Sequence, residues 1–369
     1  GDPTKDKSPI LTKIAYGSIK HYKEMGYETP RFAFVNFTDM LRTDRVNVFS
    51  EKYITPEIAS LFIDNLVVTL LKNLEPSWKE KMDFWANNAV IYVKSVAYKC
   101  YKERKLGINT LPHLISICLY DYDEVLAWLE EDKEIRMNMQ SILTPWKTGG
   151  NSAGQLSGVI SSVQTPMTKM NNKYLFWVMS PSKEEELNLD ITNKEHPTLL
   201  CVGNAPTLKE AVTPAISCIA SVLLSQMNNP GKQSSVFLVD EFPTVLLQGI
   251  DVFIGTARKH MVSTILALQD YNMAKRDYGE NSAKILKSTC GTQAFGMTGN
   301  SETAGEIEKL FGEQKEVQES FSEQDTGGGS RSESLQKDKM MKSRDIAGQS
   351  AGHFVGKVAD GKPAFFNLQ

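Results

Sequence analysis

Short apolar or β-branched segments in the second half of the chain constrain the fold most. Five of them are predicted strands: Tyr174–Met179, Thr198–Gly203, Ser235–Asp240, Val262–Leu268 and Thr292–Thr298. Helical patterns separate the later ones, over Thr207–Met227, Gly249–Lys259, Asn272–Tyr278, Asn281–Lys287 and Ser301–Phe311. Nearly continuous apolar strands that alternate with helices are typical of a parallel sheet covered on both faces. The sequence therefore predicts an α/β fold.

The first part of the chain also contains strand and helix patterns. Arg31–Phe37 alternates and is predicted to be a strand, and Arg45–Phe49 is a second, shorter extended piece. A buried helix is predicted from Thr55, because Thr55 is a good N-cap and Pro56 suits the first helical position.

Residues 77–165 differ from both flanks because every periodic segment there is helical. The run "SWKEKMDFWANNAVIYVKSVAYKCYKERK" has apolar residues three and four apart, as in one long helix. We therefore predict an all-α domain over 77–165, inserted between a first part of an α/β domain (1–76) and its second part (166–369).

The C-terminal region contains two further predicted features. Ser322–Asp345 is polar and rich in Gly and Ser, which indicates a flexible loop at about 324–343 or the tip of a long hairpin. Gly352–Leu368 has two short strand patterns around Asp360 and Gly361, and this predicts a closing hairpin.

The composition gives no sign of a strongly basic nucleic-acid-binding protein, a disulfide-stabilised protein, a histidine metal site or a membrane span. The net charge is −3 and the pI about 6.1, so no global basic field indicates nucleic acid, and any such contact needs a local patch. The five cysteines form no C-x-x-C pair and mostly lie in apolar runs, which predicts buried, reduced thiols. The five histidines lack metal-ligand spacing, and no segment reaches about 18 consecutive apolar residues.

Two predicted strands end in polar residues that suit a nucleotide site. Val236–Val239 is followed by Asp240 and Glu241, and the next strand ends at Gln269. In an open α/β sheet, ligands bind at the carboxyl ends of the strands. One carboxylate there can hold Mg²⁺, the other can orient or deprotonate a water, and Gln269 can contact a γ-phosphate. The alternative is that all three are solvated strand ends or helix caps.

A cation and a phosphate loop would complete such a site. Arg258 lies between the two strands, and a guanidinium can neutralise a transferring phosphoryl group, including one in a neighbouring subunit. It is equally compatible with a surface charge at a helix C-terminus. No G-x-x-x-x-G-K-[ST] motif occurs in the chain, and Lys147–Gly154 and the later Asp-Thr-Gly-Gly-Gly run both lack the lysine.

The order of these motifs resembles the TraG/TraD-type coupling proteins of type IV secretion and conjugation. The matching elements are the strand ending in Asp240 and Glu241, the Ala257–Arg258 turn, the strand ending in Gln269, the segment Cys290–Gly296 and the helix that opens at Ser301–Ala304. Further elements resemble the same family, namely "GDP" at Gly1, "RVNVF" with Val48 where proline is usual, "DFWANNAV" at Asp83, and the tail Gly352–Phe366, which is similar to Bacteroidetes-type members.

This resemblance implies a RecA-like motor ATPase with ATP and Mg²⁺ as cofactors. Asp240 would bind the metal, Glu241 would be the catalytic carboxylate, Gln269 the γ-phosphate sensor and Arg258 a finger reaching the next subunit. The family forms hexamers on the cytoplasmic face of the inner membrane and moves single-stranded DNA with its relaxase into a secretion channel, together with channel ATPases and inner-membrane components. The phosphate loop and the membrane anchor are then expected upstream of Gly1, so these 369 residues alone would not hydrolyse ATP.

Two alternatives stay open at this point. The chain could be a non-hydrolysing adaptor that kept the fold, with the all-α block recognising relaxosome proteins. It could also be another RecA-like translocase of the FtsK/HerA kind, although the inserted all-α domain favours the coupling proteins. A basic cluster at Lys94, Lys99, Lys102, Arg104 and Lys105 is either a partner site or a solvated helix face.

Overall fold

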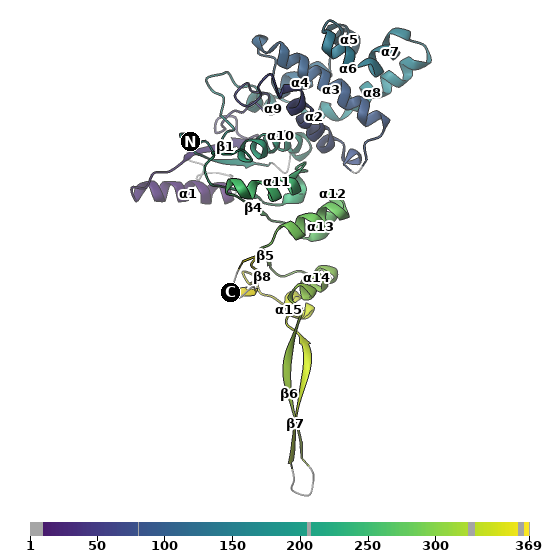
Figure 1. Ribbon diagram of the computed structural model, residues 1–369. Coiled ribbons are helices and arrows are strands. Elements are labelled where there is room, and N and C mark those ends of the chain that lie inside the picture. Colours follow the sequence, from purple (N-terminus) through teal and green to yellow (C-terminus); the bar gives the residue numbers. More distant parts are fainter. Residues whose placement is uncertain (1–9, 80, 205–207, 324–328, 361–364, 369) are drawn as a thin grey trace. The chain divides into compact units, whose positions relative to one another are not determined.

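A computed structural model describes residues 10–368, except 80, 205–207, 324–328 and 361–364 (Figure 1). The chain divides into two compact units, Gly1–Ala267 and Leu268–Gln369. The resemblance of "GDP" at Gly1 to a family strand falls outside the described residues. The first described element is helix α1 (Ile10–Glu24), which packs against the first strands of the first unit.

Strands of the first unit pair in parallel, as predicted. β1 (Arg31–Asn36) pairs with β2 (Thr198–Gly203), and Arg31 lies opposite Thr198. β3 (Ser235–Val239) pairs with β4 (Val262–Leu266), and Ser235 lies opposite Val262. Parallel strands of this kind need a crossover between them, and α11 (Ile250–Ala257) supplies it for β3 and β4. The structure therefore confirms the α/β class.

Two apolar helices form the centre of the first unit. α2 (Ala59–Leu74) packs against α10 (Lys209–Met227), and Ile63, Leu66 and Leu70 of α2 are fully buried at helical spacing. Among the described helices α10 is the one long and apolar enough to cross a membrane, but 72% of it is buried in this packing. In the structure it is a core helix.

Seven α-helices follow α2 in the chain. The first six lie where the pattern over 77–165 predicts helices, and the described residues of that range contain no strand. Their bounds are α3 (Phe84–Lys102), α4 (Leu111–Cys118), α5 (Tyr122–Glu130), α6 (Lys133–Asn138), α7 (Gln140–Thr148), α8 (Asn151–Met167) and α9 (Lys173–Met179). α3 begins where Asp83 accepts a hydrogen bond from the amide of Ala86 (2.9 Å) and contacts α4 to α8 (Figure 1). The proposed domain boundaries stay predictions.

The predicted strand Tyr174–Met179 is wrong, because this segment is helix α9. The side chain of Asn172 accepts hydrogen bonds from the amides of Tyr174 and Leu175, which starts a helix. Leu175, Val178 and Met179 are then buried together at helical spacing. A short apolar run is compatible with both the strand period and the helix period. Here the Asn172 cap and the packing on α4 favour the helix.

The region before α2 also differs in detail from the prediction. Helix α2 begins at Ala59, because residues 55–58 form a turn closed by a hydrogen bond from the amide of Ile58 to the carbonyl of Thr55 (3.1 Å). Thr55 is therefore not its N-cap. The extended piece from Arg45 makes one parallel bridge, to Glu186, and is not a longer strand.

One face of the β3–β4 pair is uncovered by the described residues, although the sequence predicts cover on both faces. Phe237 is buried and its ring meets that of Phe253 in α11, with centroids 6.0 Å apart. On the opposite face Val236, Leu238 and Ile265 are 59%, 48% and 48% exposed. Alternate residues of a strand point to opposite faces, so α11 covers only the face of Phe237.

The second unit is smaller and has its own core. It contains α12 (Tyr271–Tyr278), α13 (Glu280–Thr289), β5 (Gln293–Phe295), α14 (Ser301–Phe311), β6 (Glu313–Glu323), β7 (Gly329–Lys339), α15 (Ser343–Ala347), β8 (Phe354–Lys357) and β9 (Phe365–Leu368). Ile307, Phe311, Ile346 and Val355 bury their side chains against one another. This core ties α14 to α15 and the small sheet.

The small sheet corrects one prediction and confirms another. β5 pairs antiparallel with β8, so it does not extend the parallel sheet as its apolar pattern suggested. β8 and β9 form the predicted closing hairpin, with residues 361–364 of its turn outside the described part. The antiparallel pairing arises because β8, from the C-terminal tail, supplies the neighbouring strand.

The polar segment Ser322–Asp345 forms part of a long hairpin, which was one of its two interpretations. β6 and β7 pair antiparallel from Glu313–Lys339 to Glu323–Gly329. The flexible-loop interpretation is therefore wrong for residues 329–339, and residues 324–328 lie outside the described part. Because both strands are polar, their composition alone did not indicate that they pair as a hairpin.

The pKa of Glu308 in α14 should report the packing around it. An ion pair with Lys339 and hydrogen bonds from the hydroxyl (2.7 Å) and amide (2.8 Å) of Ser343 lower that pKa from 4.5 to about 2. The pKa is depressed in the folded state, so the stabilisation is complete above pH 4.5 and is lost as the pH falls through about 2.

We therefore expect Ser343→Ala to raise the Glu308 pKa, as measured by a carboxyl NMR titration. Ser330→Ala, in the same chain but in β7, is the control for a lost hydroxyl. An unchanged Glu308 pKa in Ser343→Ala would contradict the assigned contacts.

Candidate functional site

Asp240 and Glu241 lie at the carboxyl end of the parallel β3–β4 pair. Asp240 follows the last residue of β3, and both side chains are exposed. The amide of Ala267, just after β4, donates to the carbonyl of Val239 (2.9 Å), and the amide of Phe242 donates to the carbonyl of Ala267 (2.8 Å). These bonds hold the two strand ends side by side, at the place where α/β sheets bind ligands.

The backbone at Glu241 is in a left-handed conformation. Its φ is 50°, a region that a residue with a side chain rarely adopts and that costs about 1–2 kcal/mol. The carboxylate of Asp240 accepts a hydrogen bond from the Glu241 amide (3.0 Å), and Phe242 and Pro243 are buried in the following turn. The contacts on both sides of Glu241 therefore maintain a strained turn, which is common at functional sites.

Asn73, which the sequence analysis did not identify, fixes the loop after this turn. Its side-chain amide donates to the carbonyl of Leu246 (3.0 Å) and its side-chain oxygen accepts from the Leu246 amide (3.0 Å). The sequence signal that could have identified Asn73 is its polar side chain near the end of the otherwise apolar helix α2. The same side-chain amide also donates to the carbonyl of Thr69 in α2 (2.9 Å), so Asn73 ties the loop to the helix and is a positioning residue.

Arg258 lies at the opposite end of the β3–β4 pair from the two carboxylates. It starts a short 3-10 turn (Arg258–His260), and its carbonyl accepts from the amide of Met261 (3.0 Å). The carbonyl of Met261 accepts from the amide of Ser235, the first residue of β3 (3.1 Å). A five-residue strand spans about 13 Å, so the structure does not bring Arg258 and Glu241 together within one copy.

The Arg258 side chain is exposed, and among the described residues it forms no ion pair. Gln269 is also exposed but belongs to the second unit, three positions after β4 ends. The next residue, Asp270, caps α12 through the amide of Asn272 (2.9 Å) and accepts from the Asn300 side chain (3.2 Å). These hydrogen bonds lower the Asp270 pKa, first of all the one from Asn272, and fix the chain beside Gln269.

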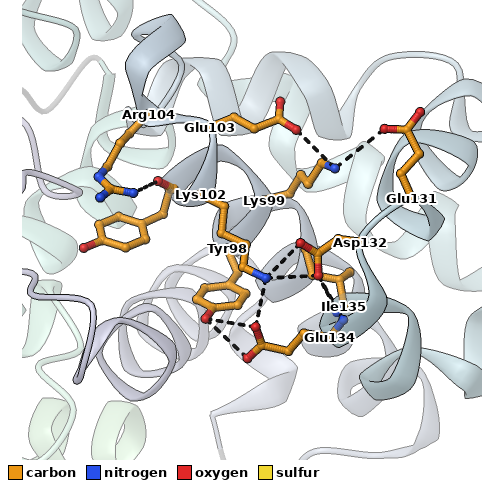
Figure 2. A network of polar contacts seen from close by, with 10 residues as sticks. Tyr98, Lys99, Lys102, Glu103, Arg104, Glu131, Asp132, Glu134 and Ile135 are labelled. Atoms are coloured by element: carbon orange, nitrogen blue, oxygen red, sulfur yellow. Dashed lines mark hydrogen bonds and ion pairs between the residues drawn. The ribbon is translucent and has the colours of Figure 1, made fainter.

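The basic cluster near the end of α3 is largely neutralised within the first unit (Figure 2). The ion pairs are Lys94–Asp64 (3.0 Å), Lys99–Glu103 (3.1 Å), Lys102–Asp132 (2.8 Å), Lys102–Glu134 (2.8 Å) and Arg104–Glu51. Lys99 is buried and also lies over the Trp128 ring, 5.4 Å from its centroid. These contacts join α3 to α2, α5 and α6, so four of the five cations serve the fold.

The arrangement at the strand ends suits a metal nucleotide. Carboxylate oxygens are the ligands that Mg²⁺ prefers, usually one or two from the protein with the rest from phosphates and water. Asp240 offers such an oxygen from an exposed position, and Glu241 is held beside it. The residues present therefore fit Mg²⁺ bound with a nucleotide, and a water near Glu241 could lose a proton to it.

Known proteins resemble this chain in part of its sequence and in its fold. Residues 235–350 match a family model described as the TraM recognition site of TraD and TraG. No curated protein matches the chain by sequence. The bacterial conjugative coupling protein TrwBdeltaN70, in an unbound form, has a TM-score of 0.71 and 15% identity, with 100% of this chain and 82% of that chain covered.

Two further TrwB structures give similar values. The complex with ADP and Mg²⁺ has a TM-score of 0.67 at 15% identity and covers 100% of this chain and 82% of that chain. The complex with a non-hydrolysable ATP analogue has a TM-score of 0.66 at 15% identity and covers 97% and 81%. The family match begins at the first residue of β3, and the chain shares the RecA-like fold of the TrwB structures over its whole length, so both comparisons support a TraG/TraD-type coupling protein.

Proposed function

We propose that the chain is the larger part of a motor that uses ATP hydrolysis to recruit DNA with its relaxase and to pump it into a type IV secretion channel. The observation that carries this proposal is the strained Asp240–Glu241 turn at the carboxyl end of a parallel strand pair. Two exposed carboxylates in a strained turn at a strand end are a common feature of functional sites.

Each predicted site residue has a role in this proposal. Asp240 holds Mg²⁺ through its carboxylate, and the bound ion neutralises charge on the phosphate oxygens. Glu241 accepts a proton from the attacking water, and Gln269 contacts the terminal phosphate through its amide. Arg258 acts in the site of a neighbouring copy, because it lies far from Glu241 in its own chain.

The proposed chemistry needs a phosphate-binding loop, and residues 1–369 contain no G-x-x-x-x-G-K-[ST] motif. The exposed apolar face of Val236, Leu238 and Ile265 supports a further layer there, because strand side chains of this kind are normally covered. We also propose that the motor works at the cytoplasmic face of the inner membrane.

Partners are proposed on the basis of the family and structural matches. The matched family model is named for recognition of TraM, which supports contact with relaxosome proteins through residues 235–350. TrwB was crystallised with ADP and Mg²⁺ and with an ATP analogue, which supports a nucleotide cofactor here. A homo-hexamer with DNA at its centre, docked on channel ATPases, completes the proposed assembly.

DNA transfer with both carboxylates removed is the experiment that tests this function. We expect Asp240→Asn combined with Glu241→Gln in the full-length protein to reduce conjugative transfer by at least about 100-fold, because hydrolysis supplies the driving force. Transfer at the wild-type frequency would favour a non-hydrolysing adaptor of the same fold. Immunoblots and thermal melts of the variant establish that it is produced and folded.

A further inference from the structure

Asp270, which follows the proposed phosphate-contacting residue Gln269, is bonded to the starts of two helices at once. Its carboxylate accepts hydrogen bonds from the amide of Asn272 in α12 (2.9 Å) and from the side-chain amide of Asn300 (3.2 Å). The hydroxyl of Thr303 is a third, more distant donor (3.4 Å). Asp270 therefore caps the helix that begins after it and also reaches the residues that begin α14.

Asn300 is itself the N-cap of α14. Its side-chain oxygen accepts hydrogen bonds from the amides of Glu302 (2.9 Å) and Thr303 (3.2 Å). Since the cap occupies that oxygen, the side-chain nitrogen of Asn300 is the group that donates to Asp270. The bond between the two caps thus has a defined polarity, with the carboxylate as acceptor. One negative charge between two helix N-termini is also favourable to both helix dipoles.

Ion pairs hold the same helices together beyond their caps. Lys275 of α12 pairs with Glu302 (3.1 Å) and Glu306 (3.2 Å) of α14. Lys287 of α13 pairs with Glu306 as well (2.6 Å). The ammonium groups of both lysines lie over the ring of Tyr271, 5.2 and 4.8 Å from its centroid. The bond between the two caps therefore attaches the segment before α12 to three helices.

Gln269 lies in the short connection between β4 and α12, and its side chain is exposed. At the start of this connection the backbone of Ala267 is bonded to Val239 and Phe242, and at its end Asp270 is bonded to the helix caps. A side chain that contacts a phosphate in the transition state must be placed to within about 0.5 Å. Asp270 is the group that can set this placement from the helical side.

We propose that Asp270 is a positioning residue that holds Gln269 in contact with the terminal phosphate by joining the caps of α12 and α14. This inference rests on the proposed function, in which Gln269 contacts that phosphate. Asp270 acts through its neighbour in this role and does not touch the nucleotide. Its loss should therefore lower kcat while the KM for ATP changes little, because the contact that it supports is made in the transition state.

Asp270→Asn separates this role from helix capping. Asn and Asp are about equally good N-caps, so the oxygen of the new side chain can still accept from the amide of Asn272. Its other atom becomes a donor that faces the donor nitrogen of Asn300, and the bond between the caps is lost. We expect kcat for ATP hydrolysis by the full-length protein to fall about tenfold, with KM within about twofold of the wild type. A helix cap without a positioning role predicts an unchanged kcat.

Exchanging the two side chains should restore the bond with reversed polarity. When Asp270→Asn is combined with Asn300→Asp, the carboxylate at position 300 can cap α14 and accept from the new amide at position 270. We expect kcat of this double variant to return to within about threefold of the wild type. Asn300→Asp alone sets two carboxylates against each other and should lower kcat at least about tenfold.

Glu280→Gln, at an exposed carboxylate in the first turn of α13, is the matched control and should keep kcat within about twofold. Thermal melts establish that each variant is folded. A folded double variant that is no more active than Asp270→Asn would exclude the bond between the caps as the cause of the loss.

Gln269→Ala decides whether Asp270 acts through its neighbour. In that background Asp270→Asn should lower kcat by less than about twofold further, because the side chain that it positions is absent. A further loss of the full tenfold would overturn the proposal. The same result is reached if Gln269→Ala hydrolyses ATP at the wild-type rate, since no phosphate contact then remains to be positioned.

Failure of this inference and failure of the proposed function give different results. If the wild-type protein hydrolyses ATP and Gln269→Ala is impaired while Asp270→Asn is not, the positioning role alone is wrong and the motor function stands. If the wild-type protein does not hydrolyse ATP, the proposed function is wrong and the positioning role is wrong with it.

Discussion

Glu241→Gln in the full-length protein is expected to slow ATP hydrolysis by about 10²–10⁴-fold while nucleotide binding is retained. Gln cannot accept the proton of the attacking water, and general-base catalysis contributes an effect of this size. Asp240 keeps its carboxylate in this variant, so the metal ligand is unchanged. Steady-state hydrolysis and equilibrium binding of a fluorescent ATP analogue measure the two quantities separately.

The backbone conformation of Glu241 allows a second variant that separates the effect on stability from the effect on hydrolysis. Because Glu241 has a φ of 50°, Glu241→Gly should fold as well as the wild type or be more stable by about 1 kcal/mol, while hydrolysis is lost. A gain in stability with a loss of activity is expected where strain serves function. Asp251→Asn, in the first turn of α11, is the control for a lost carboxylate and should keep most of the activity. Hydrolysis at the wild-type rate in Glu241→Gln would exclude the catalytic assignment.

Arg258→Ala is expected to reduce hydrolysis by about 10³–10⁵-fold, the range measured for arginine fingers. Higher ATP concentration should not restore activity, because the guanidinium acts on the transition state and is supplied from outside the nucleotide's own chain. Lys259→Ala, the adjacent exposed cation, is the matched control and should leave the rate within about twofold.

Mixed assemblies test whether Arg258 acts between copies. Glu241→Gln and Arg258→Ala are each expected to be inactive alone. In a mixture, about a quarter of the shared sites combine an intact Glu241 from one copy with an intact Arg258 from its neighbour, as a head-to-tail interface allows. Recovery of hydrolysis on mixing is therefore expected, and no recovery would place Arg258 in the site of its own chain or outside the site.

The sequence alone determined the elements whose signals are local. β2 was predicted with the bounds that the structure has, because its six residues are apolar or β-branched throughout. α14 was also predicted with its observed bounds, and Asn300 caps it through the amides of Glu302 and Thr303. The position of Asp240 and Glu241 at a strand end followed in the same way from one short apolar run.

The tertiary structure alone decided features that depend on residues distant in sequence. Tyr174–Met179 is apolar enough for a strand, but Asn172 and the packing on α4 make it a helix. β5 is antiparallel because the C-terminal tail provides β8 as its neighbour.

The partners of charged residues were likewise undetermined by the sequence. The sequence shows the cations of α3 as a basic cluster, but the fold pairs them with Asp64 of α2, Glu103 at the end of α3 and Glu134 of α6. The strain at Glu241 follows from hydrogen bonds between β3 and the residues after β4, which no local pattern encodes. Local signals specify elements, whereas pairing, burial and charge compensation arise only when segments far apart in the chain meet.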